Sequence, residues 1–349
     1  MEFTQSKSQE IVVNGITMLG LANHGALCYA ISVLHMLHQV PSIHQRVVNT
    51  ERVDLPVINA LKNVFNFISR SYIEVPAEQL LSALFSALYP DQSIDIMQQK
   101  DACEFFLDLI SSFQSLPAEC NPFVTTLRGE LQHTMQSTNH PELRKQFTEK
   151  FFFLSIDVQN LRDLKASLQH FICPVNIQYR WKAGQLPQNS TKQVHILTPP
   201  SHLLLHLSRF KFDLEQKRKQ KLNSFFSFPQ LLDMTPYLAE RDQGGRRCMY
   251  RLSAVVIHQG ASAYVGHYYT LVRVHSAHTD ENDDGDILED RWVKMDNDRV
   301  TEYNVDMLAA DAFGSLHASS DVDVDDGSDD DEHGSSIQSA KLLLYDLII

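Results

Sequence analysis

The sequence has few cysteines, and none of the patterns that would assign them to a disulfide framework or a zinc site. Five cysteines are scattered through 349 residues, and no two are spaced as Cys-x-x-Cys. Disulfide scaffolds use even numbers of cysteines in short chains, and cysteine-based zinc sites use closely spaced pairs. The count therefore predicts a protein of a reducing intracellular compartment, cytoplasmic or nuclear, without a structural metal.

Long apolar runs and an excess of basic residues are missing as well. No run approaches the roughly 20 apolar residues that a membrane-spanning helix needs, and the first ten residues lack the layout of a signal peptide. The net charge of −13 argues against a nucleic-acid partner. Much of it lies at 321–332, in an acidic low-complexity stretch at about 316–336 that we interpret as a disordered insertion. We expect a soluble monomer that binds neither membrane nor nucleic acid.

The periodicity of apolar residues divides the chain into a helical part and a sheet part. From about 20 to 150, segments such as CYAISVLHMLHQV repeat apolar residues every three or four positions, as helices do. After about 150, short runs such as HLLLHLSRFKF and YRLSAVVIH favour strands, first at about 151–250 and then at about 251–349. The sequence predicts one α+β domain over 1–349, with a cleft where the two parts meet.

Three patterns resemble metal sites without completing one. The segment 280–291 follows much of the calcium-binding loop of EF-hands, but it ends in arginine where a bidentate glutamate is needed. His170 with Cys173, and His202 with His206, are the only ligand-like pairs that stand out. We interpret them as ordinary core or surface residues and expect no metal and no cofactor.

One cysteine stands where a nucleophile is prepared. In GLANHGALCYAISVLHML, Cys28 follows a glycine-containing loop and begins an apolar stretch with helical spacing. The first N–H groups of a helix favour a thiolate and can lower the pKa of such a thiol. Free cysteines are also often simply buried, so this stretch alone leaves both interpretations open.

A base and an orienting carboxylate are available at the ends of two predicted strands. His267 begins a strand in VGHYYTLV, and Asp296 ends one in WVKMDND. In such an arrangement the imidazole takes the proton of Cys28 and later returns one to the leaving amine, while Asp296 fixes the imidazole tautomer. The order Cys, His, Asp is that of papain-type proteases.

Six segments in order resemble those of the ubiquitin-specific proteases, which are deubiquitinating cysteine proteases. The segments are GLANHGALCY, QKDACEF, LSRFKF, VVIHQG, GHYYTLV and WVKMDND, and the resemblance runs from about residue 20 to the final KLLLYDLI. It implies a papain-like fold with a helical thumb, a β-sheet palm and β fingers. It also implies that Cys28, His267 and Asp296 form the catalytic triad, and that Asn23 donates to the oxyanion.

The segment QKDACEF adds a place for the substrate. Asp101 and Glu104 are three residues apart and share a face if the segment is helical, and two carboxylates suit a peptide that contains arginine. The resemblance implies that Gln99, Asp101 and Glu104 hold the C-terminal tail of ubiquitin, Leu-Arg-Leu-Arg-Gly-Gly. Without the resemblance, a solvated helix face is the simpler interpretation.

The chain departs from the family pattern in three ways. Lys100 replaces a glutamine and places a positive charge beside the two carboxylates, and Asn297 replaces the second of two acidic residues, so only an auxiliary role is expected for it. The paired cysteines that bind zinc in the fingers of many relatives are missing. The predicted activity is thiol-dependent hydrolysis of the bond after the last glycine of ubiquitin, acting on ubiquitinated proteins. The alternatives are an inactive ubiquitin-binding adaptor and a protease for another ubiquitin-like modifier.

Overall fold

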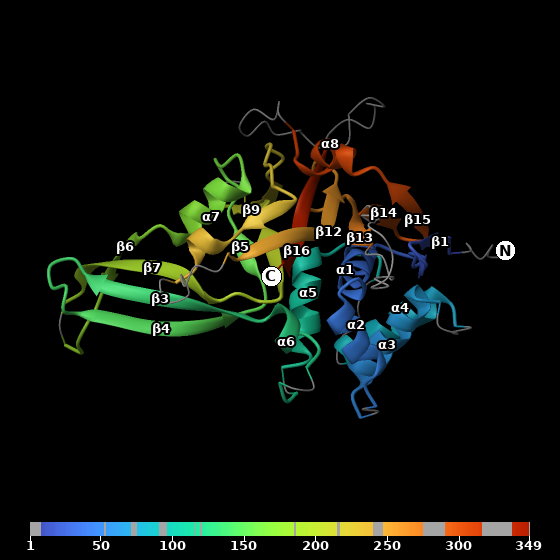
Figure 1. Ribbon diagram of the computed structural model, residues 1–349, viewed down its shortest axis with the longest axis horizontal. Coiled ribbons are helices and arrows are strands. Elements are labelled where there is room, and N and C mark those ends of the chain that lie inside the picture. Colours follow the sequence, from blue (N-terminus) through green and yellow to red (C-terminus); the bar gives the residue numbers. More distant parts are fainter. Residues whose placement is uncertain are drawn as a thin grey trace, which may run out of the picture.

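A helical lobe lies against a large β-sheet, and a second sheet extends away from both in the computed structural model (Figure 1). The predicted α+β class is confirmed. The structure describes residues 8–51, 54–70, 75–90, 96–114, 116–118, 121–184, 186–214, 217–239, 247–274, 290–315 and 337–348.

The helical lobe is built around one helix that is buried along its whole length. All of α1 (Cys28–His38) is buried, because it packs against the sheet on one side and against other helices on the other. The surrounding helices are α2 (Pro41–Val48), α3 (Pro56–Ile68), α4 (Ala77–Leu88), α5 (Ala102–Ser111) and α6 (Val124–Leu127). Both α2 and α3 begin with proline, which is pre-set for the first helical position.

The large sheet contains eight strands. Seven run in the order β15-β14-β13-β12-β16-β8-β5, and β11 also pairs with β12. The strands are β5 (Leu154–Ile156), β8 (His202–Leu207), β11 (Leu231–Asp233), β12 (Met249–Gln259), β13 (His267–Val274), β14 (Arg291–Asp296), β15 (Arg299–Tyr303) and β16 (Gln338–Ile348). All neighbours are antiparallel except β5 and β8.

Both faces of this sheet are covered, so its strands alternate between two hydrophobic cores. On β13, Tyr268 and Val272 belong to the core shared with the helical lobe. Tyr269 and Leu271 belong to a second core on the other face, beneath α7 (Leu164–Ile172) and α8 (Leu308–Ala312). Alternate side chains of a strand point to opposite faces, which explains the nearly continuous apolar sequence of β13.

The second sheet has four strands in the order β4-β3-β7-β6. They are β3 (Gly129–Ser137), β4 (Arg144–Phe151), β6 (Val175–Tyr179) and β7 (Gln188–Thr198). This is the sheet that extends to the left in Figure 1. The helical part was predicted to continue to about residue 150, but α6 ends at Leu127 and the next two elements are strands. The strand β4 is exposed at all positions except Phe151, so its sequence carries no apolar period.

Two hairpins and two short 3-10 helices complete the described chain. The hairpins are β1 (Glu10–Val13) with β2 (Ile16–Leu19), and β9 (Phe210–Asp213) with β10 (Arg218–Lys221). The 3-10 helices are η1 (Thr235–Tyr237) and η3 (Val305–Met307).

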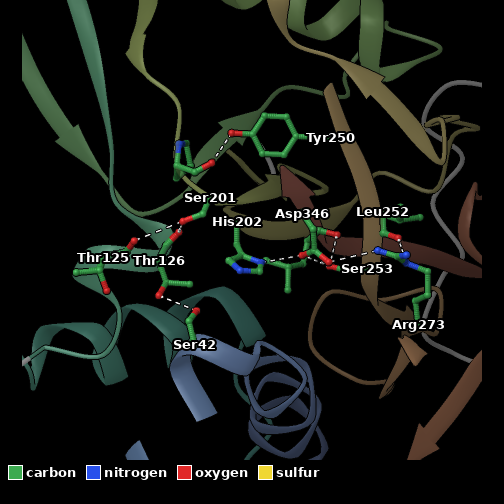
Figure 2. A network of polar contacts seen from close by, with 12 residues as sticks. Ser42, Thr125, Thr126, Ser201, His202, Tyr250, Leu252, Ser253, Arg273 and Asp346 are labelled. Atoms are coloured by element: carbon green, nitrogen blue, oxygen red, sulfur yellow. Dashed lines mark hydrogen bonds and ion pairs between the residues drawn. The ribbon is translucent and has the colours of Figure 1, made fainter. Parts of the chain in front are cut away.

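Hydroxyl groups join the helical lobe to the large sheet, as Figure 2 shows. Ser42 of α2 and Thr126 of α6 lie 3.1 Å apart through their hydroxyl oxygens. Ser201, just before β8, donates to the backbone carbonyls of Thr125 and Thr126, both at 3.4 Å. These contacts fix the start of β8 against the end of the helical lobe.

The same network continues through an acidic side chain of the last strand. His202 Nδ1 lies 2.7 Å from Asp346 Oδ1, which also accepts a hydrogen bond from Ser253 at 2.9 Å. The buried guanidinium of Arg273 lies 3.3 Å from Asp346 Oδ2. His202 is thus held by a carboxylate across the strand pair β8 and β16, as expected for an ordinary histidine of the fold.

Two segments singled out in the sequence lie wholly or mostly outside the described residues. The acidic stretch 316–336 lies outside the described residues, as does most of the calcium-loop-like segment 280–291. Within the described ranges, no group of three or more His, Cys, Asp or Glu side chains is placed to hold a metal ion. No helix there has both the length and the apolar character needed to cross a bilayer. The absence of zinc from the fingers stays a prediction.

Candidate active site

Cys28 is the first residue of α1 and directly follows a loop. One side chain of that loop stabilises it by hydrogen bonds to the loop backbone. The thiol-bearing residue is only 4% exposed. In the preceding loop, Asn23 Oδ1 accepts hydrogen bonds from the backbone N–H groups of Gly25 and Leu27, both at 3.2 Å. With that oxygen engaged, the Nδ2 amide is the part of Asn23 left to donate to another group. The position of Cys28 at the helix start agrees with the sequence prediction.

Two glycines allow this loop to lie against neighbouring backbone. A Cβ on Gly25 would lie 2.5 Å from the carbonyl oxygen of Ile96, which accepts the N–H of Ala26 at 2.8 Å. A Cβ on Gly20 would lie 2.5 Å from the carbonyl oxygen of Asn297. Any side chain at either position would displace backbone, so the loop before Cys28 depends on both glycines.

The base and the carboxylate lie on adjacent strands of the large sheet. His267 begins β13, and Asp296 ends β14, its antiparallel neighbour. His267 Nε2 lies 2.5 Å from Asp296 Oδ1. The side chain of Cys28 also acts on the imidazole, since it contributes to raising the pKa of His267. Since Nε2 is held by Asp296, Nδ1 is the ring nitrogen left for the thiol.

Charge and hydrogen bonding set the protonation of this pair. The hydrogen bond to Asp296 raises the pKa of His267 to about 9, helped by the side chain of Cys28 and opposed by burial. Burial acts to raise the pKa of Asp296, but the hydrogen bond and charge of His267 outweigh burial and lower it, with help from Lys294. At neutral pH the pair is therefore an imidazolium and a carboxylate.

Lys294 is a site residue that the sequence analysis did not single out. Its Nζ lies 3.3 Å from Asp296 Oδ2 and 4.0 Å from the centre of the Tyr269 ring. It is two residues before Asp296 on the same strand, so the two side chains share a face of the sheet. The spacing of two residues between Lys294 and Asp296 is the sequence signal that could have identified Lys294. Lys294 orients the second carboxylate oxygen, while His267 holds the first.

Asn297 lies in the turn between β14 and β15, directly after the triad carboxylate. It has a φ of 52°, a conformation that asparagine tolerates better than most residues. Its carbonyl accepts the N–H of Leu21 at 2.8 Å, and its Oδ1 is buried without a hydrogen-bond partner among the described residues. The structure thus places Asn297 beside the triad, where it connects the turn to the loop that leads to Cys28.

Gln99 contacts the backbone just before the strand that carries His267. Its Oε1 accepts the N–H of Gly266 at 3.1 Å, one residue before His267. Lys100, next to it, lies with its Nζ 5.1 Å from the centre of the Tyr89 ring. Gln99 therefore fixes the entry into β13 from the helical lobe.

The two carboxylates of QKDACEF have different surroundings. Asp101 caps α5 by accepting the N–H of Cys103 at 2.7 Å. Its Oδ2 lies 2.8 Å from Nζ of Lys341, with side chains 10% and 3% exposed. Glu104 is 60% exposed and lies 3.5 Å from Lys219 of β10. Only Glu104 presents its carboxylate to solvent, because Asp101 is engaged within the protein.

A thiol, an imidazole and a carboxylate thus stand in series where a helical lobe meets a sheet. The nucleophile comes from the first helix, and the other two side chains come from neighbouring strands of the sheet. This is the arrangement expected of a cysteine protease of the papain type.

Comparison with known proteins identifies the family. The family "Ubiquitin carboxyl-terminal hydrolase" matches residues 19–345, and the chain belongs to it. It is 29% identical over 309 residues to ubiquitin carboxyl-terminal hydrolase 48 of Danio rerio, covering 81% of this chain and 27% of that protein. It is 28% identical over 299 residues to ubiquitin carboxyl-terminal hydrolase 26 of Arabidopsis thaliana, covering 82% and 26%.

A solved structure supports the fold. The chain resembles one in the SAGA Ubp8/Sgf11/Sus1/Sgf73 DUB module bound to ubiquitin aldehyde, with a TM-score of 0.73 at 20% identity, covering 99% of this chain and 72% of that one. Identity at this level speaks for the fold alone. The chain spans about a quarter of the length of the two curated relatives.

Proposed function

We propose that this chain is a deubiquitinase, a thiol protease that hydrolyses the peptide or isopeptide bond after the C-terminal glycine of ubiquitin. The observation that carries the proposal is the 2.5 Å contact between His267 Nε2 and Asp296 Oδ1, in a member of this family, where Cys28 also helps to raise the pKa of His267. The proposed partners are ubiquitin and ubiquitinated proteins. No metal takes part in the steps below.

The first half of the reaction forms an acyl-enzyme. The thiolate of Cys28, paired with the imidazolium of His267, attacks the carbonyl carbon of the last glycine. The imidazolium then donates its proton to the nitrogen of the leaving lysine, and the C–N bond breaks. Asp296 stabilises the imidazolium during this step and holds its tautomer afterwards. A thioester between Cys28 and ubiquitin remains.

The second half returns the enzyme to its starting state. A water molecule attacks the thioester carbonyl while the neutral imidazole of His267 takes its proton. The C–S bond breaks, which releases ubiquitin with a C-terminal carboxylic acid that loses its proton to solvent, and leaves the thiolate and imidazolium paired again.

Asn23 is proposed to stabilise the oxyanion in both halves. Its Oδ1 is fixed by two backbone N–H groups of its own loop, so its Nδ2 donor has a set direction before substrate binds. Preorganised donors of this kind act where negative charge develops on the carbonyl oxygen. The backbone N–H of Cys28 is the proposed second donor.

Glu104 is proposed to bind an arginine of the ubiquitin tail. It is the exposed carboxylate of its segment, and Lys219 is an exposed partner that an arginine can replace. Asp101 acts on the same region indirectly, by capping the helix that carries Glu104.

An electrophilic probe tests this function. Ubiquitin with a C-terminal vinyl or alkyne warhead is expected to form a covalent adduct with the wild-type protein and none with Cys28→Ala. Cys103→Ala removes another buried thiol and serves as the matched control, since the adduct should persist. The same warhead on another ubiquitin-like modifier tests whether the chain acts on that modifier instead of ubiquitin. The proposal fails if wild-type protein forms no adduct with ubiquitin, or if Cys28→Ala still hydrolyses a fluorogenic ubiquitin amide.

A further inference from the structure

The loop at 260–266 leads directly into the catalytic histidine and is mostly exposed. Gly266, its last residue, approaches the preceding strand so closely that a Cβ would lie 2.4 Å from Nε2 of His258. The Gly266 N–H is held by Gln99. His267 follows without an intervening residue and pairs with Gln259 of β12, so the path of this loop and that strand pair together set where the imidazole stands relative to Cys28.

The other end of the loop is held by a lysine. Nζ of Lys221, the last residue of β10, donates to the backbone carbonyl of Gly260 at 2.6 Å and to that of His258 at 3.1 Å. A third contact, at 3.4 Å, reaches the carbonyl of Ile337 just before β16. All three acceptors are carbonyl oxygens, so this one amine closes the junction of β12, β16 and the loop, although burial, with Arg209 and Lys341 nearby, lowers the pKa of Lys221 to about 7. An ammonium has three N–H donors, which matches this arrangement.

The segment that carries Lys221 is itself fixed to the sheet by a second cation. Arg209 is 1% exposed and donates through Nη1 to the carbonyls of Leu222 and Ser224, both at 2.9 Å. Its Nε donates to the carbonyl of Ala340 on β16 at 3.0 Å. The backbone next to Lys221 is therefore held in place by these hydrogen bonds.

Two neighbours of Lys221 hold the middle of the same loop. The amide of Asn223 donates to the carbonyl of Ala261 at 3.1 Å. The backbone N–H of Lys219 donates to the hydroxyl oxygen of Tyr264 at 2.7 Å. The residues 219–223 thus contact the loop at its start and near its centre, and Gln99 contacts it at its end.

We propose that Lys221 is a positioning residue for the catalytic imidazole. Its ammonium fixes the start of the loop 260–266 on the end of β10, and the loop in turn presents His267 to Cys28. This inference rests on the proposed function, because it assigns the alignment of that same catalytic pair to a residue that does not touch the substrate. Misplacing a reacting group by about 1 Å can lower a rate by about 100-fold.

The test compares Lys221→Met with Lys221→Arg and with Lys211→Met. Methionine keeps most of the length of the side chain without its charge or donors, and arginine keeps donors for carbonyls. Lys211 is an exposed lysine of the neighbouring strand that contacts Gln159. Two quantities are measured, the hydrolysis of a fluorogenic ubiquitin amide and the pH dependence of Cys28 alkylation by iodoacetamide. The second needs no ubiquitin and reports the thiolate–imidazolium pair directly.

Lys221→Met is expected to lower kcat by about 10- to 100-fold with little change in KM. Alkylation of its Cys28 at acidic pH should be slower than in the wild type, by about 10-fold or more, because the thiol is no longer aligned with the imidazolium. Lys221→Arg should regain most of the rate, and Lys211→Met should match the wild type. The proposal is overturned if Lys221→Met keeps the wild-type alkylation profile, even if its melting temperature is lower.

A surface variant keeps the proposal testable if Lys221→Met does not fold. Tyr264→Phe removes one loop contact from an exposed side chain, and alkylation of Cys28 at acidic pH should slow by about 2- to 10-fold. An unchanged rate of Cys28 alkylation in Tyr264→Phe would overturn the proposal. If the wild type shows paired-thiolate alkylation but no ubiquitin hydrolysis, the proposed function fails, while the comparison of alkylation profiles still decides the role of Lys221.

Discussion

Replacing Asp296 by asparagine tests whether a carboxylate sets the charge of the catalytic imidazole. The hydrogen bond and charge of Asp296 contribute to raising the pKa of His267 to about 9 from its ordinary 6.5. An asparagine amide can still accept the Nε2 proton, but it brings no negative charge. The imidazolium of Asp296→Asn therefore loses its proton at a lower pH than that of the wild type.

The size of the effect follows from the exposure of the pair. The side chains of His267 and Asp296 are 35% and 26% exposed, so water screens part of their attraction. We expect the pKa of His267 to fall by about one to two pH units, which corresponds to about 1.4 to 2.7 kcal/mol less stabilisation of the imidazolium. Because only the imidazolium donates the proton to the leaving amine, kcat/KM near about pH 8 should fall about 2- to 10-fold, in step with the smaller protonated fraction.

The assay is the pH profile of kcat/KM for a fluorogenic ubiquitin amide, between about pH 5 and pH 10. In Asp296→Asn the alkaline limb should move to lower pH, since a group with a raised pKa keeps its proton until the pH rises through that value. Asp298→Asn removes the same charge two residues away and should leave the limb in place. The reasoning is refuted if the limb does not move in Asp296→Asn, or if it moves equally in both variants.

Three further substitutions test other parts of the site and its surroundings. Asn23→Ala should lower kcat by about 100- to 1,000-fold with KM nearly unchanged in steady-state assays, and a loss confined to KM would contradict the oxyanion role. Lys341→Met should lower the free energy of unfolding in urea by about 3 to 5 kcal/mol, because it leaves the Asp101 carboxylate buried and unpaired. Adding Asp101→Asn should recover most of that loss, and a double variant no more stable than the single one would contradict it. His35, whose two ring nitrogens are buried without partners in the described part of the chain, should be replaceable by leucine with a gain of about 1 to 2 kcal/mol in urea unfolding, and a loss would show that the ring is bonded in solution.

The three residues proposed as the catalytic triad could be located from the sequence because each stands at the end of a helix or strand. Cys28 follows a loop and begins an apolar helix, while His267 and Asp296 begin and end strands. Positions at element ends are visible in a sequence because the periodicity changes there. The contact between α1, β13 and β14 could not be predicted from the sequence, because it depends on the strand order of the sheet and on packing between distant segments.

The surroundings of Asp101 show why contacts were harder to predict than positions. The spacing to Glu104 suggested one shared helical face, but Asp101 is the N-cap, outside the first turn, and its carboxylate turns back to Cys103 N. Its second partner, Lys341, is 240 residues away in the sequence. No local pattern reports a pair of that separation.

The first two strands of the second sheet, β3 and β4, were missed for a different reason. In β3, buried and partly buried residues alternate strictly, yet the sequence GELQHTMQS offers few of the β-branched residues by which strands are recognised. The next strand, RKQFTEKF, is almost wholly exposed. A sheet with so little apolar surface is specified mainly by its backbone pairing, which composition does not reveal.

The place of β16 in the large sheet has a consequence for synthesis of the protein. This strand, at 338–348, lies between β12 and β8 and forms hydrogen-bonded pairs with both. The strands that carry His267 and Asp296 therefore connect to β8 only through a segment that the ribosome makes after all of them. Until that segment leaves the ribosome, β12 and β8 of the nascent chain each have an edge without its partner strand. The strands that carry His267 and Asp296 cannot then join β8 in a continuous sheet.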